Sequence, residues 1–537
     1  MAKVKKEKNI EEALWESCNA LRGAVDTAEY KHIVLSLVFL KFANDKFNER
    51  RQELIDDGKS NYLEITEFYT MKNVFYIPEK SRWQYIMDNA KQDDIKTKID
   101  TALSSIENSN KSLKGALPDN YYSNLKSLEP SNLASLLDEI NKINTIKDKN
   151  EDIIGRVYEF FLKKFALAEG KGKGEFYTPK CVVNLIAELI QPYKGKIYDP
   201  ACGSGGMFVQ SMKFVEKHHG NKKDISIYGQ EWNGTTYKLA KMNLAIRGIS
   251  ADLGEKATST FTNDQHRDLK ADFIMANPPF NQSKWRAEDE LVNDERWDGY
   301  VVPPTGNANY GWILNMVSKL NADGVAGFLL ANGSLSGGGA EYDIRKQLIE
   351  NHLVDAIFYL PRNLFYTTDI GVSLWIISRN RKERVVDIAD EPTVFRNREN
   401  EILFVDLRKW GSPFEKKYIE LTDNDDPNNL GDIQKIVKTY HDWASVEGFK
   451  NYKDIPEYCA SVKIKKENDN DKVLKDYSLV PSEYIEFVNK DENVDFDSRM
   501  KELSTELKDL LKKDEESKIE LKKILKELGY AIEEEEL

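Results

Sequence analysis

The tetrapeptide Asn277-Pro278-Pro279-Phe280 carries groups that could act together on a planar, nitrogen-bearing substrate. Asn277 offers an amide oxygen and an amide NH2 group, and Phe280 offers the flat face of a ring. The two prolines fix the backbone. Because proline cannot join the hydrogen-bond ladder of a sheet, the carbonyl groups between them point into a site. These features suit a flat ring with an exocyclic amine.

Such an amine is a poor nucleophile because its lone pair is delocalised into the ring. Two acceptors, the Asn277 side-chain oxygen and the Pro278 carbonyl, could hydrogen-bond both N–H groups as the nitrogen becomes tetrahedral and gains positive charge. This electrostatic stabilisation requires neither a metal ion nor a covalent intermediate. Taken alone, the motif also fits a strand-end turn in which Asn277 caps the chain and Phe280 fills the core.

The residues before the tetrapeptide, 271–276, form a short apolar run that predicts a buried strand. The tetrapeptide would then lie at the carboxyl end of that strand, where open α/β sheets bind ligands. Alternating strands and helices predict an α/β fold with a mainly parallel sheet, closed by its last two strands, of which the final one is antiparallel. The other expected strands are 196–198, 225–229, 325–330, 354–360 and 372–378, with helices at 310–320 and 342–351.

A glycine-rich turn, DPACGSGG at 199–206, follows the first expected strand. Its glycines let the backbone approach a ligand closely before a helix begins. Asp199 would repel a phosphate, and the turn departs from the dinucleotide-binding pattern. Glu231, at the end of the next strand, can take the two hydroxyls of a ribose. S-adenosylmethionine has an ammonium group, a ribose and an adenine but no phosphate, so it fits these residues better than a dinucleotide.

Two further segments are candidates for the same ligand. Residues 171–180 are glycine-rich and basic and then switch to a helix start, with Thr178 as the expected N-cap and Pro179 as the first helical residue. We expect this segment to fold over the ligand with the Tyr177 ring lining it. A plain linker and helix cap is the alternative. Asn263-Asp264 lies where a third strand should end and could hydrogen-bond an adenine, although a simple turn fits equally well.

Composition restricts the classes of protein to which the chain could belong. The 537 residues carry a formal net charge of −13. A protein that holds DNA alone usually shows a basic surface, so either the basic surface is local or a partner supplies much of the phosphate contact. The charged start predicts no signal peptide, and the longest apolar stretch, around Ile33 to Leu40, is too short to span a bilayer. The scattered cysteines favour a reducing cytoplasm over a zinc site: Cys18, Cys181, Cys202 and Cys459.

Changes in composition predict three parts. Residues 1–165 are expected to form a helical N-terminal domain, 166–490 a catalytic domain with a C-terminal extension, and 491–537 a C-terminal helix. Asp514 and Ser517 interrupt the apolar spacing of the last part and predict a break in its middle. A solvated terminal helix is the alternative to one that packs against another helix. The apolar residues at 3-4 spacing are Leu503, Leu507, Leu510, Leu521, Ile524 and Leu528.

The motifs in combination resemble a known family. FYTP at 176–179, then DPACGSGG, Glu231 and NPPF at 277–280, follow the order seen in the gamma group of amino-methylating DNA methyltransferases. The segments 264–266, 269–273 and 276–281 look like the modification subunit of type I restriction–modification systems. Residues 360–365, followed by 375–380, support the same family. The helical N-terminal domain and helical tail also match, so the resemblance covers nearly the whole chain.

The resemblance implies a Rossmann-like, S-adenosylmethionine-dependent methyltransferase domain and an adenine N6 methyltransferase in the cytoplasm. The target adenine would be flipped from the duplex, stacked on Phe280, with N6 held by Asn277 and Pro278 beside Pro279. The residues implied for the cofactor, with Asp264 as the candidate at its adenine, are Glu175, Phe176, Tyr177, Thr178, Pro179, Lys180, Asp199, Gly203, Ser204, Gly205, Gly206 and Glu231.

The resemblance also implies partners. In this family a separate specificity subunit recognises double-stranded DNA and is flanked by two modification subunits, and a restriction subunit is a further partner that the family allows. The acidic balance of this chain agrees with that division. The C-terminal helix would be the natural contact with the specificity subunit.

Three alternatives remain at this stage. NPPY-type motifs also serve glutamine methylation in proteins, but those enzymes are shorter and lack the FYTP order. Cytosine N4 methylation usually goes with Ser in place of Asn277. A non-catalytic assembly or DNA-binding subunit could keep the fold, but the intact Asn277, Phe280, Asp199 and Glu231 argue against it.

Overall fold

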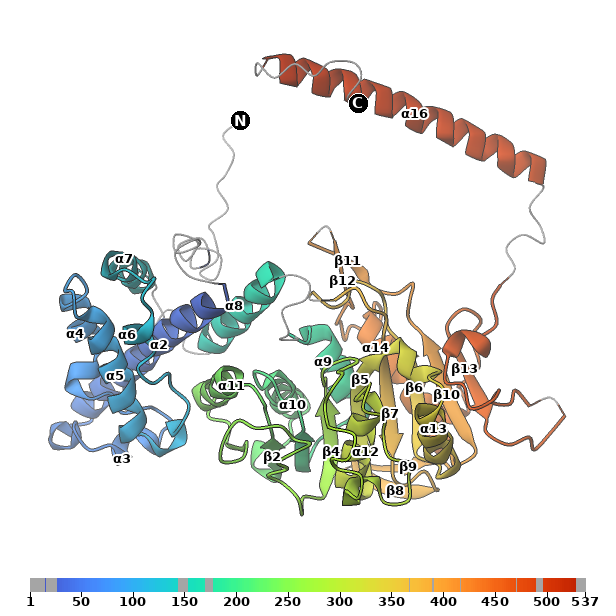
Figure 1. Ribbon diagram of the computed structural model, residues 1–537, viewed down its shortest axis with the longest axis horizontal. Helices are drawn as coiled ribbons and strands as arrows, with labels where there is room; N and C mark the ends of the chain where they lie inside the picture. Colours follow the sequence, from blue (N-terminus) through green and yellow to red (C-terminus); the bar gives the residue numbers. More distant parts are fainter. Residues whose placement is uncertain are drawn as a thin grey trace. The chain divides into compact units, whose positions relative to one another are not determined.

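The computed structural model describes residues 15, 27–142, 153–169, 177–366, 368–388, 391–415, 417–469, 471–488 and 496–527. The chain divides into two compact units, Met1–Ile485 and Glu486–Leu537. The first unit carries a group of helices followed by a mixed sheet with helices on both faces, as Figure 1 shows. The predicted domain limits at residues 165 and 490 stay predictions.

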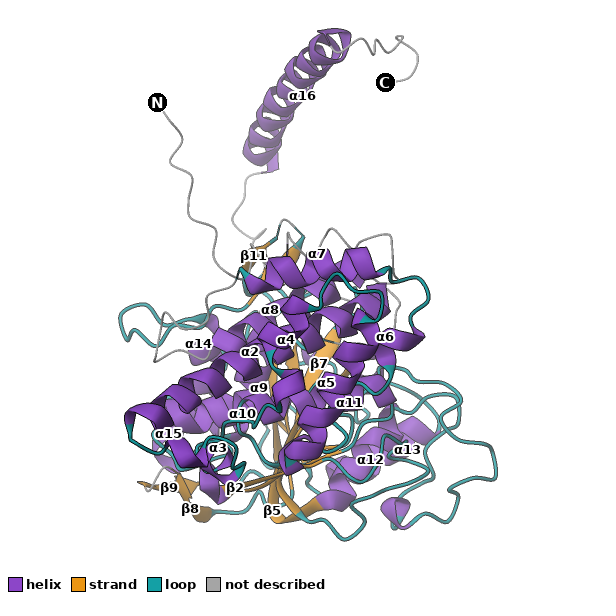
Figure 2. Cartoon of the chain, turned by 90° about the vertical axis from the view of Figure 1, so that its left-hand side faces the viewer, coloured by secondary structure: helices purple, strands orange, loops and turns teal. Residues whose placement is uncertain are grey.

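The N-terminal part of the first unit is helical, as predicted (Figure 2). Apolar side chains of its helices share one buried core. The buried Tyr122 hydroxyl donates to the Ile33 carbonyl at 2.9 Å and so ties two of these helices together. The helices are α2 (Thr27–Asp56), α3 (Glu67–Thr70), α4 (Trp83–Asp88), α5 (Ile95–Ser109), α6 (Tyr121–Asn124), α7 (Pro130–Asn141) and α8 (Ile153–Glu169).

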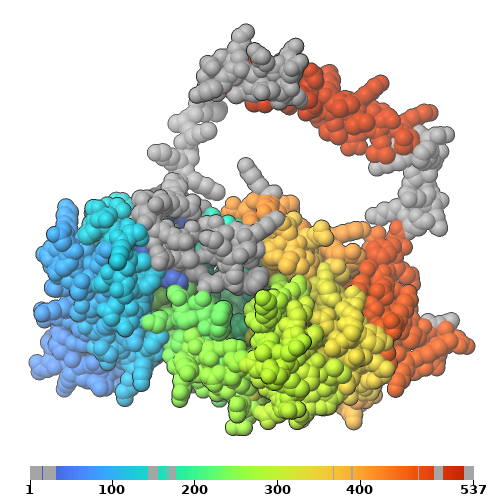
Figure 3. All heavy atoms as spheres, viewed as in Figure 1, coloured from blue at the N-terminus to red at the C-terminus, as the bar shows by residue number. Residues whose placement is uncertain are grey.

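This helical part packs directly on the part that carries the sheet. Leu239 and Met242, on α11 (Gly234–Ile246), belong to the same buried core as the N-terminal helices. The Lys241 Nζ atom donates to the Lys114 carbonyl at 3.1 Å. Figure 3 accordingly shows the blue N-terminal helices against green residues of the sheet-bearing part.

Within the described residues, one sheet contains nine strands in the order β13-β10-β6-β7-β5-β4-β1-β2-β3. The strands from β3 to β5 are parallel to one another, and β7 is antiparallel to both of its neighbours, as predicted for the last strand. The strands are β1 (Gly195–Asp199), β2 (Ile225–Gly229), β3 (Ala251–Asp252), β4 (Ala271–Ala276), β5 (Leu320–Ala331), β6 (Val354–Tyr359), β7 (Val372–Ser378), β10 (Glu401–Asp406) and β13 (Cys459–Lys463).

Helices cover both faces of this sheet, and two hairpins lie outside it. The remaining helices are α9 (Lys180–Ile190), α10 (Gly206–Lys217), α12 (Asn309–Lys319), α13 (Ala340–Glu350), α14 (Asp432–Ala444) and α15 (Val446–Phe449). The hairpins pair β8 (Arg384–Ile388) with β9 (Glu391–Phe395) and β11 (Ser412–Phe414) with β12 (Tyr418–Glu420).

Side chains along the central strands alternate between two cores. On β4, Ile274 and Ala276 belong to the core shared with α12 and α13, whereas Met275 belongs to the core shared with α9 and α14. This is the period of two that a strand imposes on its side chains. Because both faces are buried, these strands read in the sequence as continuous apolar runs.

Two predictions about the sheet were wrong. The strands β6 and β7 do not close it, because β10 pairs in parallel with β6 and β13 pairs with β10. The third strand does not end at Asn263-Asp264. It is the two-residue β3, which pairs with β2 at Ile227 and Tyr228. A strand this short leaves no apolar run by which the sequence could reveal it.

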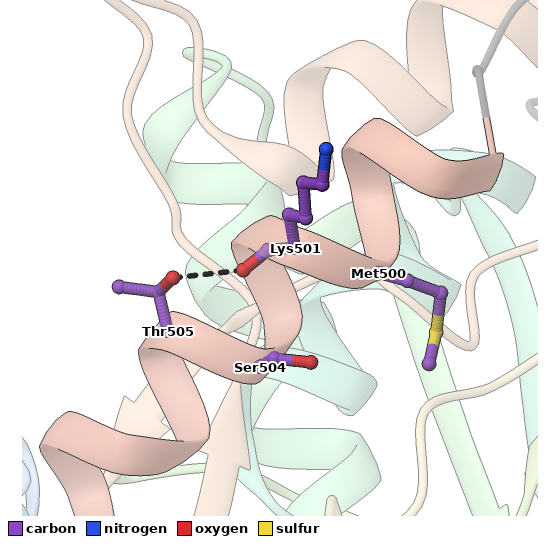
Figure 4. Close-up of a pocket in the computed structure, with 4 residues that line it drawn as sticks. All are labelled: Met500, Lys501, Ser504 and Thr505. Atoms are coloured by element: carbon purple, nitrogen blue, oxygen red, sulfur yellow. Dashed lines mark hydrogen bonds between the residues drawn. The ribbon is translucent and has the colours of Figure 1, made fainter.

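The second unit carries α16 (Phe496–Glu527), which is one continuous helix, so the predicted break in its middle was wrong. Asp514 instead pairs with Lys518 one turn later at 3.0 Å, which supports the helix where the break was expected. Apolar side chains along it, such as Leu507 and Leu510, are more than half exposed. Figure 4 shows a hollow on this helix whose described lining comes only from α16: Met500, Lys501, Ser504 and Thr505.

A buried group of charges fastens the edge of the sheet formed by β6 and β10. The Asp355 carboxylate, which is fully buried on β6, accepts from Arg381 Nε at 2.9 Å, from Arg398 Nε at 3.2 Å and from the Tyr440 hydroxyl at 2.8 Å. Burial alone would raise the pKa of Asp355, but the charges of Arg398 and Arg381 hold it below its ordinary value. The carboxylate therefore stays ionised and joins β6 to α14.

Replacing Asp355 should destabilise the fold strongly. Asp355→Ala leaves two buried guanidinium groups without their counter-charge, so we expect the free energy of unfolding to fall by about 3–5 kcal/mol. Urea unfolding followed by circular dichroism measures this. The control is Asp469→Ala, which removes a fully exposed carboxylate paired with Lys466 and should leave the free energy of unfolding nearly unchanged. Equal effects of the two substitutions would contradict the role given to Asp355.

Candidate active site

The tetrapeptide follows directly on β4, so its residues lie at the carboxyl end of a central strand, as predicted. Asn277 is only 8% exposed. Its Nδ2 atom donates to the Thr178 Oγ1 atom at 2.8 Å. Its Oδ1 atom is buried and has no hydrogen-bond partner among the described residues. A buried acceptor without a partner costs about 1–3 kcal/mol, so this oxygen is a candidate acceptor for a hydrogen bond from a ligand.

The Phe280 ring lies beside an aromatic segment that follows β6. Its centroid is 6.1 Å from that of Phe365, with the two rings nearly perpendicular at 86°. The neighbouring Tyr366 ring stacks on Tyr177, with centroids 6.0 Å apart and planes at 14°. The sequence singled out 360–365 only as a family motif and assigned no role to Phe365. Its position after the carboxyl end of a sheet strand was the signal that could have found it.

The turn after β1 and the acid after β2 come together, as the parallel pairing of these strands requires. The Gly203 N–H donates to Glu231 Oε2 at 3.0 Å, and the Ala201 N–H donates to Asp199 Oδ1 at 2.9 Å. Gly203 and Gly205 have φ values of 54° and 80°, in the left-handed region that favours glycine. Two carboxylates thus lie next to a glycine-lined turn that opens α10.

Burial makes Asp199 an unusual acid. It is 1% exposed, and burial raises its pKa to about 8, with the negative charge of Glu231 adding to the rise and the Ala201 hydrogen bond opposing it. The protein thus keeps an acidic group in a place that disfavours its charge. A cation placed between Asp199 and Glu231 would favour the charged form of Asp199 despite its burial and would offset the repulsion from Glu231.

The segment before α9 and the glycine-rich turn line one cavity. Its volume is about 260 Å³, and it is bounded on its other sides by α8 and α10. Its Gln210 Oε1 atom is buried and has no partner among the described residues. The lining residues predicted for the cofactor are Tyr177, Thr178, Lys180, Ser204 and Gly206.

The predicted start of α9 was wrong by one residue. The helix begins at Lys180, and Pro179, with ψ at 140°, is its N-cap. The Thr178 side chain therefore does not cap the helix, and its hydroxyl contacts Asn277 instead. Two other residues predicted for the cofactor, Glu175 and Phe176, lie outside the described residues.

Asp264 is already engaged by the protein. Its Oδ2 atom lies 2.6 Å from the Nζ atom of Lys319, and its Oδ1 atom accepts from the His266 N–H at 2.9 Å. Burial lowers the pKa of Lys319, and the Asp264 carboxylate opposes that effect.

Trp232, which follows Glu231, is 74% exposed and presents a ring that the sequence did not single out. Within the described ranges, no three His, Cys, Asp or Glu side chains gather as a metal site would need.

Comparison with known proteins decides the family. A family model described as N-6 DNA methylase matches residues 149–493, and one described as HsdM N-terminal domain matches residues 10–140. The chain belongs to the N-6 DNA methylase family. The predicted resemblance and enzyme class, an adenine-specific N6 DNA methyltransferase of the type I modification-subunit kind, are confirmed. That description names DNA and N-6, which separates this family from protein glutamine and cytosine N4 methyltransferases.

Similar proteins from other organisms extend the match over most of the chain. The MjaIX methylase subunit of a type I restriction enzyme from Methanocaldococcus jannaschii is 34% identical over 97% of this chain and 92% of its own length. The HindI methylase subunit from Haemophilus influenzae is 38% identical over 84% of this chain and 100% of its own length. A crystal structure of a type I methyltransferase subunit from Streptococcus thermophilus superposes with a TM-score of 0.69 at 22% identity, covering 89% of this chain and 99% of that one. This last likeness confirms the fold of the family.

Because the pKa of Asp199 is raised in the folded protein, the contribution of this residue to stability should depend on pH. The folded protein holds a proton on Asp199 up to about pH 8, whereas the unfolded chain releases it near 3.8. Stability from this group is therefore present at low pH and is lost as the pH rises through about 8. Asp199→Asn should raise the melting temperature of the ligand-free protein more at pH 9 than at pH 5.

Differential scanning fluorimetry at the two pH values measures this effect. The matched control is Asp298→Asn, which changes an exposed aspartate and should shift the melting temperature equally at both. The same shift for Asp199→Asn at pH 5 and pH 9 would show that Asp199 is ionised throughout.

Proposed function

We propose that this site binds S-adenosylmethionine and transfers its methyl group to N6 of an adenine flipped out of double-stranded DNA. The observation that carries the proposal is the buried Asn277 Oδ1 atom, which has no partner among the described residues and follows directly on β4. An amine that becomes positively charged needs such an acceptor. Family membership adds that the nitrogen is N6 of adenine.

The acidic side of the site fits the cofactor. Asp199 and Glu231 lie beside the glycine-rich turn. The ammonium group of S-adenosylmethionine would restore the negative charge that burial disfavours on Asp199, and Glu231 suits the ribose hydroxyls. When bound, the cofactor supplies an electrophilic methyl group on a sulfonium sulfur. The chain provides the surroundings. Gly203, Gly205 and Gly206 allow close approach of the backbone beside Ser204. Tyr177, Thr178 and Lys180 line the adjoining cavity, with Glu175, Phe176 and Pro179 next to them in sequence. Asp264 contributes at the adenine while paired with Lys319.

The acceptor side holds the adenine. The Asn277 oxygen and the Pro278 carbonyl accept the two N–H groups of N6 and favour the tetrahedral, positively charged nitrogen. The Phe280 ring stacks on the base, and Pro279 holds the backbone between them. Phe365 supports Phe280 from the side, since the two rings are in edge-to-face contact. A flipped base is therefore read by hydrogen bonding on one edge and by stacking on one face.

Removing the Asn277 side chain tests the catalytic assignment. Asn277→Ala should lower the rate of methyl transfer by at least about 10²–10³-fold, because one stabilising group is lost at the developing charge. Affinity for S-adenosylmethionine and assembly should stay unchanged. Transfer of labelled methyl groups to DNA gives the rate, and calorimetry gives the affinity.

The control for this test is Asn293→Ala, which changes an exposed asparagine in the loop that follows the site and should leave all three measurements unchanged. Loss of cofactor binding or assembly in Asn277→Ala would remove the role assigned to Asn277. Wild-type rates in that variant would contradict the proposed function.

We also propose that α16 docks this chain onto a specificity subunit, with two copies of the chain for each specificity subunit and a restriction subunit as a further partner in the cytoplasm. The similar proteins are named methylase subunits of type I restriction enzymes. On α16 an apolar row is exposed, and the chain has a net charge of −13, so a partner is suited to supply phosphate contacts. The row consists of Leu503, Leu507, Leu510, Leu521 and Ile524. Leu528, which was predicted to continue it, lies outside the described residues.

Charge placed in this row should prevent assembly. The double variant Leu507→Asp/Leu510→Asp should no longer co-purify with the specificity subunit and should leave host DNA unmethylated, since two carboxylates would be buried at the interface. Light scattering of the wild-type complex gives the ratio of the two chains. The control Thr505→Asp adds charge away from the row and should retain both assembly and methylation. Assembly by the double variant would exclude this docking surface.

A further inference from the structure

One contact links the segment before α9 to the methyl-accepting site. Thr178 Oγ1 accepts the hydrogen bond from Asn277 Nδ2 at 2.8 Å, although the two residues are 99 positions apart in the chain. An asparagine amide presents an acceptor at one end and two donors at the other, in nearly the same shape. Only the acceptor end can receive a hydrogen bond from an exocyclic amine. The direction of the Asn277 amide therefore matters for the reaction.

We infer that Thr178 is a positioning residue for Asn277: its hydroxyl engages the NH2 end of the amide and so leaves the oxygen end for the amine of the substrate. This inference rests on the proposed function. It also assigns Thr178, which the sequence placed among the cofactor-binding residues, to the acceptor side of the site.

The Thr178 hydroxyl is available for this task because the local structure does not use it. Helix α9 begins at Lys180 with Pro179 as its N-cap, and no side chain among the described residues caps it. A residue that precedes a proline is restricted to extended backbone conformations, which limits the directions that the Thr178 side chain can take. The neighbouring Tyr177 ring is held by its stack on Tyr366.

Tight packing fixes α9 relative to β4. Gly327 on β5 is so close to α9 that a Cβ atom there would lie 2.8 Å from Ile186 Cγ2 and 3.2 Å from Ile190 Cγ2. Strand β5 pairs with β4 in register, with Gly327 opposite Met275. Thr178 and Asn277 are thus placed relative to one another through three packed elements, α9, β5 and β4, which suits a positioning residue.

The test separates positioning of Asn277 from binding of the cofactor. Thr178→Val keeps the shape of the side chain and removes the hydroxyl. We expect kcat for methyl transfer to fall by about tenfold to a hundredfold, with the Kd for S-adenosylmethionine and the KM for DNA within about twofold of wild type. Thr178→Ser, which restores the hydroxyl, should recover most of the kcat lost in Thr178→Val.

A matched control shows whether loss of any threonine hydroxyl has this effect. Thr439 on α14 also accepts a hydrogen bond, from the Tyr458 hydroxyl at 2.9 Å, and Thr439→Val should leave kcat at the wild-type value. The melting temperature of each variant shows whether the fold is retained.

Several results would overturn the inference. They are an unchanged kcat in Thr178→Val, a raised Kd for the cofactor at unchanged kcat, or a failure of Thr178→Ser to recover activity in a folded protein. If Asn277→Ala itself kept wild-type activity, the proposed function would fail first. If Asn277→Ala lost activity while Thr178→Val kept it, only the positioning role would be wrong.

Discussion

The site depends on the parallel pairing of β1 with β4 in the middle of the sheet. Ile197 lies opposite Phe273 and Tyr198 opposite Ile274, so Asp199 and Asn277 leave the same edge of the sheet. The order of the strands reverses at this pair: β2 lies next to β1 on one side, and β5 lies next to β4 on the other. A parallel sheet with helices on both faces leaves an opening at such a point. The position of the site is therefore a consequence of how the central strands pair.

The same physical cost, the burial of polar groups, has two different outcomes in this molecule. Asp355 is buried among arginines that hold its pKa below the ordinary value, and its role is to join β6 to neighbouring segments. Asp199 is buried beside another carboxylate, and its pKa rises. Asn277 likewise keeps an acceptor without a partner among the described residues. The polar groups of Asp199 and Asn277 are thus uncompensated at the candidate site, whereas the carboxylate of Asp355 is compensated within the fold.

Much of the sheet could be predicted because its central strands are buried on both faces and leave continuous apolar runs. Prediction failed where local sequence carries little information. The short β3 has no such run, and β10 and β13 lie within a charged region whose pairing is set by distant strands. The N-cap preference of Thr178 was a local argument, and a tertiary contact with Asn277 overrode it. That contact could not be read from spacing, because it depends on how α9 packs on β5.

The proposed assembly assigns the chemistry and the docking to different units of the chain. The site is built from one sheet edge and the residues before α9, and all of its described parts belong to the first unit. The exposed apolar row belongs to α16 in the second unit. A row of this kind is costly in water, which supports the docking role proposed for α16. If a specificity subunit covers the row, as proposed, that subunit would read the base sequence and Asn277 would act on the adenine. The acidic chain then needs no extensive basic surface of its own, because its partner contributes contacts to the phosphates.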